Sequence, residues 1–156
     1  MKKTKNILFV CMGNICRSPA AEGVFRKMVA DAGMGEQVQI DSAGTIGYHS
    51  GHPADSRMRA AASARGYSLD SRARRIEPRD FGEFDLIVTM DDDNYRDVTG
   101  IDTGAGARVV RMCDYCTQHD HGEVPDPYYG GASGFETVLD ILEDACGNLL
   151  ARFSKG

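Results

Sequence analysis

The chain lacks any apolar stretch long enough to span a membrane, and its first residues lead into an apolar run at residues 7–10 only. A run this short cannot form the hydrophobic core of a signal peptide. We therefore expect a cytoplasmic protein without a membrane partner.

Positive charge is also scarce, since 18 Lys and Arg stand against 23 Asp and Glu and give a formal net charge of −5 at pH 7. Nucleic acids and anionic membrane surfaces attract basic proteins, so this balance argues against both as partners. Any attraction for a phosphate group must come from a few local residues.

Internal repeats, linkers and low-complexity tracts are absent as well. A chain of 156 residues with 42% hydrophobic and 26% charged content fits a single domain over residues 1–156. The 5 cysteines are an odd number, and in a domain of this size they indicate reduced thiols better than a disulfide framework.

The most informative segment present is residues 11–19, CMGNICRSP, which directly follows the apolar run. That run predicts a buried strand, and Ser18 followed by Pro19 predicts the N-cap and first turn of a helix. At such a junction the N–H groups of the loop and of the first helical turn converge, and the helix dipole adds positive potential. The segment therefore predicts a cradle for a tetrahedral oxyanion.

Within this cradle Cys11 is the candidate nucleophile. The converging donors and the nearby Arg17 favour the thiolate over the thiol. Arg17 also offers a planar fork that binds two phosphoryl oxygens at once. Gly13 and Asn14 tolerate the left-handed backbone that a tight anion loop requires. Ser18 can donate its hydroxyl to the sulfur when the sulfur departs as a leaving group.

Hydrophobic periodicity predicts alternating strands and helices. We expect strands at 7–10, 38–42, 85–90 and 108–112, and helices at 18–32, 53–66 and 135–153. This alternation implies an α/β fold in three layers, with a parallel sheet covered by helices on both faces.

The stretch 117–134 interrupts this periodicity and has the composition of a functional loop. It contains Asp126, the second candidate catalytic group, because expelling an alkoxide or phenolate needs a proton donor opposite the nucleophile. An Asp-Pro turn without chemistry is the alternative. Tyr128 and Tyr129 follow directly and can line a slot for an aromatic leaving group.

Two clusters raise the question of a metal. Zinc prefers Cys and His ligands, and four such residues lie close together at Cys113, Cys116, His119 and His121. Their spacing is tighter than in usual zinc motifs, so a loop with incidental thiols is favoured over a zinc site. The acidic run at 91–93 suits magnesium or, equally, the N-terminus of a helix. We predict no metal at either place.

The segment 11–18 resembles the signature of the low-molecular-weight protein tyrosine phosphatases: Cys, five residues, Arg and Ser or Thr near the N-terminus. The resemblance continues through 41–45, 89–91 and 126–130 to the closing helix. It implies a four-stranded parallel sheet in strand order 2-1-3-4 and hydrolysis of phosphotyrosine without metal or cofactor. It also implies a phosphocysteine on Cys11, phosphoryl binding by Arg17, and Asp126 as general acid and then base.

The resemblance further implies a set of supporting residues. Substrate contacts are expected from Met12, Gly13, Asn14, Ile15, Cys16, Ser18, Tyr48, Tyr128 and Tyr129, and support for the loops from Ser42 and Asp91. Asn14, Ser18 and Ser42 match the family's polar network around the loop Asn, while the histidine of that network is replaced here by Ser71. Cys16 resembles the family's protective disulfide partner for Cys11, and a second buried thiol without this role is the alternative. The expected partners are phosphotyrosine-containing proteins and inorganic phosphate, which is both product and inhibitor. The protein is expected to be a monomer.

Three alternatives remain. Related phosphatases that act on phosphoarginine resemble this pattern with threonine at the position of Ile15. Thiol-linked arsenate reductases relay electrons through cysteines after the third strand, whereas residues 89–111 contain none. A phosphate-binding module without turnover would not need a cysteine and an Asp-Pro-Tyr-Tyr segment together.

Overall fold

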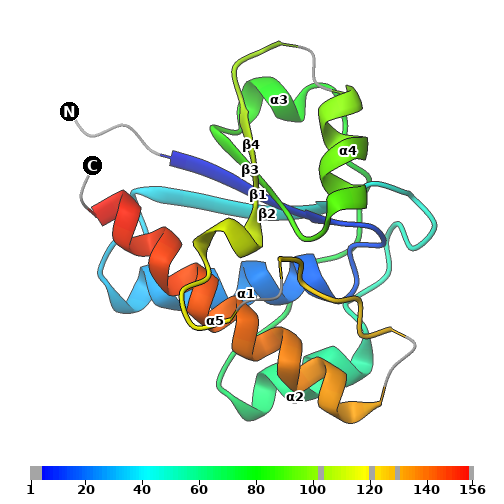
Figure 1. Cartoon of the computed structure of the whole chain (residues 1–156), viewed down its shortest axis with the longest axis vertical. Coiled ribbons are helices and arrows are strands. Elements are labelled where there is room, and N and C mark those ends of the chain that lie inside the picture. Colours follow the sequence, from blue (N-terminus) through cyan, green and yellow to red (C-terminus); the bar gives the residue numbers. More distant parts are fainter. Residues whose placement is uncertain (1–4, 102–103, 120–121, 129–130, 155–156) are drawn as a thin grey trace.

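The computed structural model describes residues 5–101, 104–119, 122–128 and 131–154. Its centre is a parallel sheet of four strands in the order β2-β1-β3-β4 (Figure 1). The strands are β1 (Lys5–Cys11), β2 (Val38–Gly44), β3 (Leu86–Thr89) and β4 (Arg108–Arg111). The predicted sheet and its strand order are confirmed.

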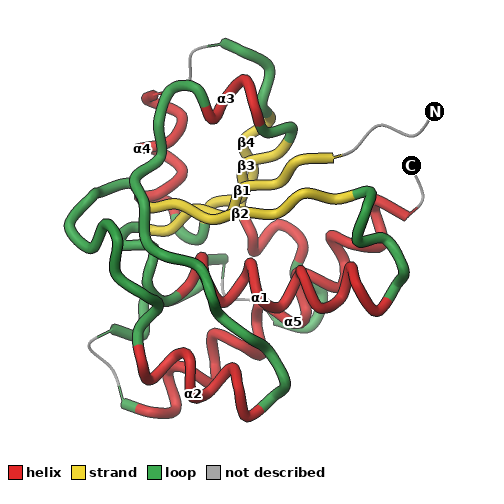
Figure 2. The backbone as a smooth tube through the Cα atoms, turned by 180° about the vertical axis from the view of Figure 1, so that it is seen from behind, coloured by secondary structure: helices red, strands yellow, loops and turns green. Residues whose placement is uncertain are grey.

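Helices cover both faces of the sheet, as predicted (Figures 1 and 2). On one face lie α1 (Arg17–Asp31) and α5 (Ala132–Ser154), with α2 (Ser56–Ala64) packed against both. On the other face lie α3 (Asp80–Glu83) and α4 (Asp92–Ile101), and a short 3₁₀ helix, η1 (Met112–Tyr115), follows β4. Within the described ranges, no helix is long and apolar enough to cross a membrane.

The central strand β1 is buried on both faces, which explains its continuous apolar run. Ile7 and Phe9 belong to the core beneath α1 and α5, while Leu8 and Val10 belong to the core beneath α3 and α4. All four side chains are fully buried. Since parallel strands alternate their side chains between two covered faces, every residue in this run must be apolar. The end of β1 is thereby fixed in space.

Several predicted boundaries were wrong by a few residues. Helix α1 begins at Arg17 with Cys16 at the N-cap position, where no side chain caps it, so the prediction of Ser18 as the cap was wrong. The physical reason is that the Ser18 hydroxyl contacts Cys11 Sγ instead, at 3.0 Å. Asp55 caps α2, which begins at Ser56 rather than at residue 53. Strand β2 continues to Gly44, beyond the predicted end at residue 42.

Candidate active site

The phosphate loop, residues 11–18, joins the carboxyl end of β1 to the first turn of α1. Cys11 is 2% exposed and lies at the base of this loop. Its Sγ accepts the Asn14 N–H at 3.3 Å and lies 3.0 Å from Ser18 Oγ. Donors to a sulfur stabilise the thiolate form, the form that attacks an electrophile. The predicted nucleophile therefore has stabilising donors in place.

Asn14 holds the loop in its curled shape. Its φ of 58° is left-handed, the only such value among the non-glycine residues that the structure describes. Its side-chain amide donates to Ser18 Oγ at 2.8 Å and to Ser42 Oγ at 3.0 Å, and its Oδ1 accepts the Arg74 N–H at 3.0 Å. The structure thus brings together the residues expected to form the polar network. Three hydrogen bonds offset the cost of the left-handed backbone.

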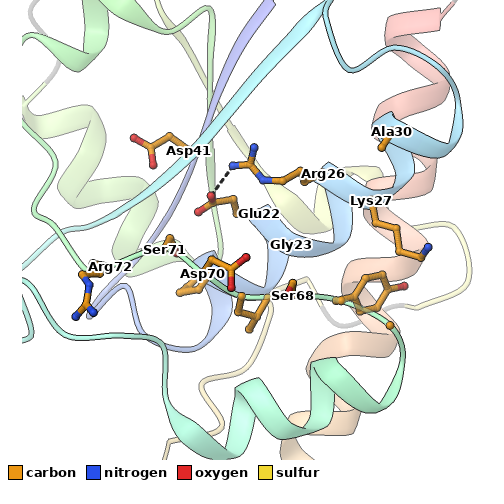
Figure 3. Close-up of a pocket in the computed structure, with 14 residues that line it drawn as sticks. Glu22, Gly23, Arg26, Lys27, Ala30, Asp41, Ser68, Asp70, Ser71 and Arg72 are labelled. Carbon is orange, nitrogen blue, oxygen red and sulfur yellow. Dashed lines mark hydrogen bonds and ion pairs between the residues drawn. The ribbon is translucent and has the colours of Figure 1, made fainter.

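The network continues into Glu22, which the sequence analysis missed. Glu22 is 8% exposed, accepts the Ser42 hydroxyl at 2.6 Å and pairs with Arg26 at 2.7 Å. It lies in a groove of about 690 Å³ between α1 and residues 66–72, which Ser71 also lines (Figure 3). A glutamate within a helix gives no signal of this role, because only the approach of β2 brings Ser42 within reach.

Arg17 is 3% exposed and lies between two carboxylates. Its Nη1 donates to Asp91 Oδ2 at 2.6 Å and to the Val124 carbonyl at 3.1 Å, and its Nη2 lies 3.6 Å from Asp126 Oδ2. Burial acts to lower the pKa of Arg17, but the Cys11 charge and the hydrogen bond to Asp91 outweigh it and raise that pKa. The guanidinium is therefore a fixed positive charge held in one orientation by Asp91, the support residue predicted from the sequence.

A small cavity of about 70 Å³ collects most of the predicted site. It is lined by Cys11, Met12, Gly13, Ile15, Cys16, Arg17, His49, Asp126 and Tyr128. Asp126 is partly exposed, and its Oδ1 accepts the Tyr128 N–H at 3.0 Å. A thiol, a guanidinium and a carboxyl group therefore line one cavity. Groups of these three types can act chemically as a nucleophile, as a binding site for negative charge and as a proton donor.

Of the tyrosines predicted to contact substrate, Tyr128 lines the cavity and Tyr48 does not. Tyr48 is 82% exposed and lies outside the residues that line the cavity, with its ring centroid 4.8 Å from that of His49 in an edge-to-face arrangement. His49 lines the cavity instead, and its ring centroid lies 6.3 Å from that of Tyr128. Tyr129 lies outside the described residues. A histidine beside a tyrosine carries no sequence signal that says which ring faces the cavity.

The second thiol of the loop, Cys16, is 4% exposed. Burial, followed by the charges of Asp55 and Cys11, raises the pKa of Cys16 to about 12. Cys16 therefore stays protonated near neutral pH, in contrast to the role expected of the nucleophile. Of the two thiols in the predicted redox pair, Cys11 has hydrogen-bond donors beside its sulfur, and Cys16 keeps its proton.

The start of the loop that carries Asp126 is held by Asp144 of α5. This carboxylate is 4% exposed and accepts the backbone N–H groups of Thr117, Gln118 and His119 at 2.9–3.2 Å. Burial acts to raise the pKa of Asp144, but hydrogen bonds from the Gln118 N–H, the His119 ring and both the N–H and the hydroxyl of Thr117 outweigh it and lower the pKa to about 2. The loop therefore begins at a fixed point on α5.

The two thiols after β4 form no metal-binding group with His119, the described histidine of this segment. His119 contacts Asp144 through its Nδ1 at 3.1 Å, and burial raises the pKa of the Cys113 thiol to about 12. His121 lies outside the described residues. Over the described ranges, no group of three or more His, Cys, Asp or Glu side chains is placed to hold a metal ion.

Comparison with known proteins decides the family. The sequence profile described as low molecular weight phosphotyrosine protein phosphatase matches residues 6–156. The chain belongs to the low molecular weight protein-tyrosine-phosphatase family. A Synechocystis protein named for this family is 51% identical over 151 residues, covering 96% of each chain.

Solved structures of phosphatases share the fold of this family member. The protein tyrosine phosphatase of Entamoeba histolytica superposes with a TM-score of 0.95 at 47% identity, over 98% of this chain and 99% of that one. A Drosophila arginine phosphatase superposes with a TM-score of 0.89 at 26% identity, over 94% and 96% of the two chains. The chain is therefore a phosphatase of the low-molecular-weight class.

Proposed function

We propose that this family member hydrolyses phosphotyrosine in proteins through a phosphocysteine intermediate on Cys11. The observation that carries the proposal is the shared cavity, in which Cys11, Arg17 and Asp126 face one another. We further propose that residues 1–156 act as one monomeric catalytic domain in the cytoplasm, without a cofactor. Inorganic phosphate is the product and, because it fits the same cradle, an inhibitor.

In the first step the Cys11 thiolate attacks phosphorus in line with the departing tyrosine oxygen. Arg17 and the N–H groups of the phosphate loop stabilise the charge on the equatorial oxygens of the transition state. Asp126 gives its proton to the tyrosine oxygen as the P–O bond breaks. Cys11 now carries the phosphoryl group, and neutral tyrosine leaves.

In the second step Asp126, now a carboxylate, takes a proton from a water molecule that attacks the phosphocysteine. The P–S bond breaks, and the hydroxyl of Ser18, 3.0 Å from Cys11 Sγ, stabilises the returning thiolate. Inorganic phosphate is released and Asp126 is protonated again. The cycle needs neither a metal ion nor an external reductant.

The lining of the cavity supports tyrosine over serine as the substrate. Ile15, His49 and Tyr128 line it together with Cys11 and give it apolar and aromatic walls. A phenyl ring stacks on such walls and reaches the base of the cavity, whereas the side chain of phosphoserine is too short to do so. Tyr48, whose ring lies beside that of His49, would extend this wall toward a bound peptide.

Phosphoarginine is the second candidate substrate, favoured by the similarity to the Drosophila arginine phosphatase. Ile15 at the rim of the cavity opposes it, since the phosphoarginine enzymes that resemble this pattern have threonine there. Arsenate reduction is less consistent with the site, because Cys16 is the only other thiol among the residues that line the cavity.

The decisive experiment measures hydrolysis of p-nitrophenyl phosphate, a phosphotyrosine peptide and phosphoarginine, with excess chelator throughout. The native chain is compared with Cys11→Ser and Asp126→Ala. We expect chelator-resistant turnover of the first two substrates, none in Cys11→Ser and slow turnover in Asp126→Ala. Preferred turnover of phosphoarginine would replace the proposed substrate, and no turnover under reducing conditions would refute the phosphatase proposal.

A further inference from the structure

Arg57 in the first turn of α2 reaches across the active-site face to the loop that carries Asp126. Its Nη2 donates to the Tyr128 carbonyl at 3.0 Å. Its guanidinium carbon also lies 5.4 Å from the Tyr128 ring centroid and 4.9 Å from that of Phe135. A planar guanidinium can stack on a ring and donate hydrogen bonds at its edge at the same time, which an ammonium group cannot do. Arg57 therefore holds both the backbone and the ring of Tyr128.

The other end of this connection is the phosphate loop. Arg57 forms a fork to Asp55, with Nε 3.1 Å from Oδ1 and Nη2 2.9 Å from Oδ2. The Asp55 backbone N–H in turn donates to the Ile15 carbonyl at 2.8 Å. Burial acts to raise the pKa of Asp55, but the hydrogen bonds from Arg57 outweigh it and lower that pKa. The anchor on the phosphate-loop side thus stays charged near neutral pH.

Tyr128 connects this arrangement to the proposed general acid. Its backbone N–H donates to Asp126 Oδ1 at 3.0 Å, while Asp126 Oδ2 lies 3.6 Å from Arg17 Nη2. The position of the carboxyl group therefore depends on where the Tyr128 backbone lies. Arg57 is the side chain that links that backbone to Asp55 and, through it, to Ile15 of the phosphate loop.

We propose that Arg57 is a positioning residue that sets the distance between the phosphate loop and the general acid by joining Asp55 to Tyr128. The proposal rests on the function proposed above, because it requires Asp126 to deliver a proton. Arg57 itself does not line the catalytic cavity. Its loss should impair proton delivery and leave binding of the phosphoryl group intact.

The test compares kcat/KM for two substrates that differ in their need for an acid. Phenyl phosphate has a poor leaving group and needs protonation, whereas p-nitrophenyl phosphate has a good one and needs it less. The variants are Arg57→Ala and Arg57→Lys, the second of which keeps the charge but loses the fork and the stacking. Arg59→Ala is the matched control, because Arg59 lies two residues further along α2 and donates to Ala54 instead.

For both Arg57 variants we expect kcat/KM with phenyl phosphate to fall about 10-fold and with p-nitrophenyl phosphate less than about 3-fold, a fraction of the range that general acids contribute. The inhibition constant of Arg57→Lys for inorganic phosphate should stay near the native value. The midpoint of its thermal unfolding should also stay near the native value. Arg59→Ala should behave as the native chain does. In the Asp126→Ala background, removing Arg57 should cause no further loss, because its effect passes through Asp126.

Equal losses on both substrates, or a loss that persists in the Asp126→Ala background, would overturn the positioning role. Full activity of Arg57→Lys would also overturn it, since charge alone would then suffice. The Asp126→Ala chain by itself separates this failure from that of the proposed function. If Asp126→Ala shows no preference for the better leaving group, the proton-donor role of Asp126 fails, and the role of Arg57 fails with it.

Discussion

Replacing Asn14 separates two contributions to the phosphate loop, its backbone strain and its hydrogen bonds. Asn14→Gly removes the side chain but suits the φ of 58°. Asn14→Ala removes the same hydrogen bonds but keeps the Cβ, which the left-handed region disfavours. The two variants therefore differ mainly in backbone strain.

The magnitudes follow from the contacts. Asn14 makes hydrogen bonds to Ser18, Ser42 and the Arg74 N–H, and the residue is 2% exposed. A buried hydrogen bond contributes about 1 kcal/mol net, so Asn14→Gly should lower the free energy of unfolding by about 3 kcal/mol. The left-handed backbone should cost Asn14→Ala about 1 kcal/mol more, after allowance for the greater freedom of glycine in the unfolded chain.

Urea unfolding at neutral pH measures both free energies, and kcat/KM for p-nitrophenyl phosphate measures the effect on the site. We expect the order of stability native, then Asn14→Gly, then Asn14→Ala, with kcat/KM reduced in the same order. Equal stability of the two variants would show that the left-handed backbone stores no strain. A loss below about 1 kcal/mol in Asn14→Gly would refute the stabilising role of the three hydrogen bonds of Asn14.

Three further predictions concern other parts of the molecule. Asp144→Asn should lower the free energy of unfolding by about 2 kcal/mol at pH 7, because the pKa of Asp144 is about 2 in the folded chain and about 4 in the unfolded chain. In urea unfolding at several pH values, the difference between the native chain and the variant should shrink as the pH falls from about 4 toward 2. A difference that does not change with pH would contradict this prediction. Glu22→Ala should destabilise the chain by about 1–2 kcal/mol in the same assay, because the Ser42 hydroxyl loses its buried acceptor; an unchanged midpoint would exclude that contact. Cys16→Ser should recover less activity on addition of thiol after hydrogen peroxide, because a Cys11 sulfenic acid without its partner is oxidised further to the irreversible sulfinic acid. The native chain should recover through a disulfide between Cys11 and Cys16, and equal recovery of the two chains would exclude Cys16 as the partner.

The sheet was predictable because its signals are local. The run at 7–10 and the apolar segments near residues 86 and 108 mark buried strands, and the Ser-Pro pair marks the region where α1 begins. The exact start of α1 was not predictable, because the Ser18 hydroxyl has two possible partners, the helix N-terminus and the Cys11 sulfur. Only the folded loop decides between them, and it selects the sulfur.

The catalytic candidates were predictable from their spacing, but most of their supports were not. Cys11 and Arg17 belong to one short motif, and family resemblance assigned Asp126. Glu22 and Arg57 are ordinary helix residues in sequence, and their partners lie 20 and 71 residues away. Such pairs arise only when tertiary packing brings β2 to α1 and the loop after η1 to α2.

The proposed mechanism requires that Cys11 carries the phosphoryl group during turnover, and this intermediate can be trapped. The native chain and Cys11→Ser are mixed with a phosphotyrosine peptide, quenched with acid within milliseconds and digested for mass spectrometry. We expect a phosphorylated peptide containing Cys11 in the native chain, formed no more slowly than phosphate is released, and none in Cys11→Ser. Release of phosphate with no phosphate on Cys11 at any quench time, or undiminished turnover by Cys11→Ser, would refute the phosphocysteine mechanism.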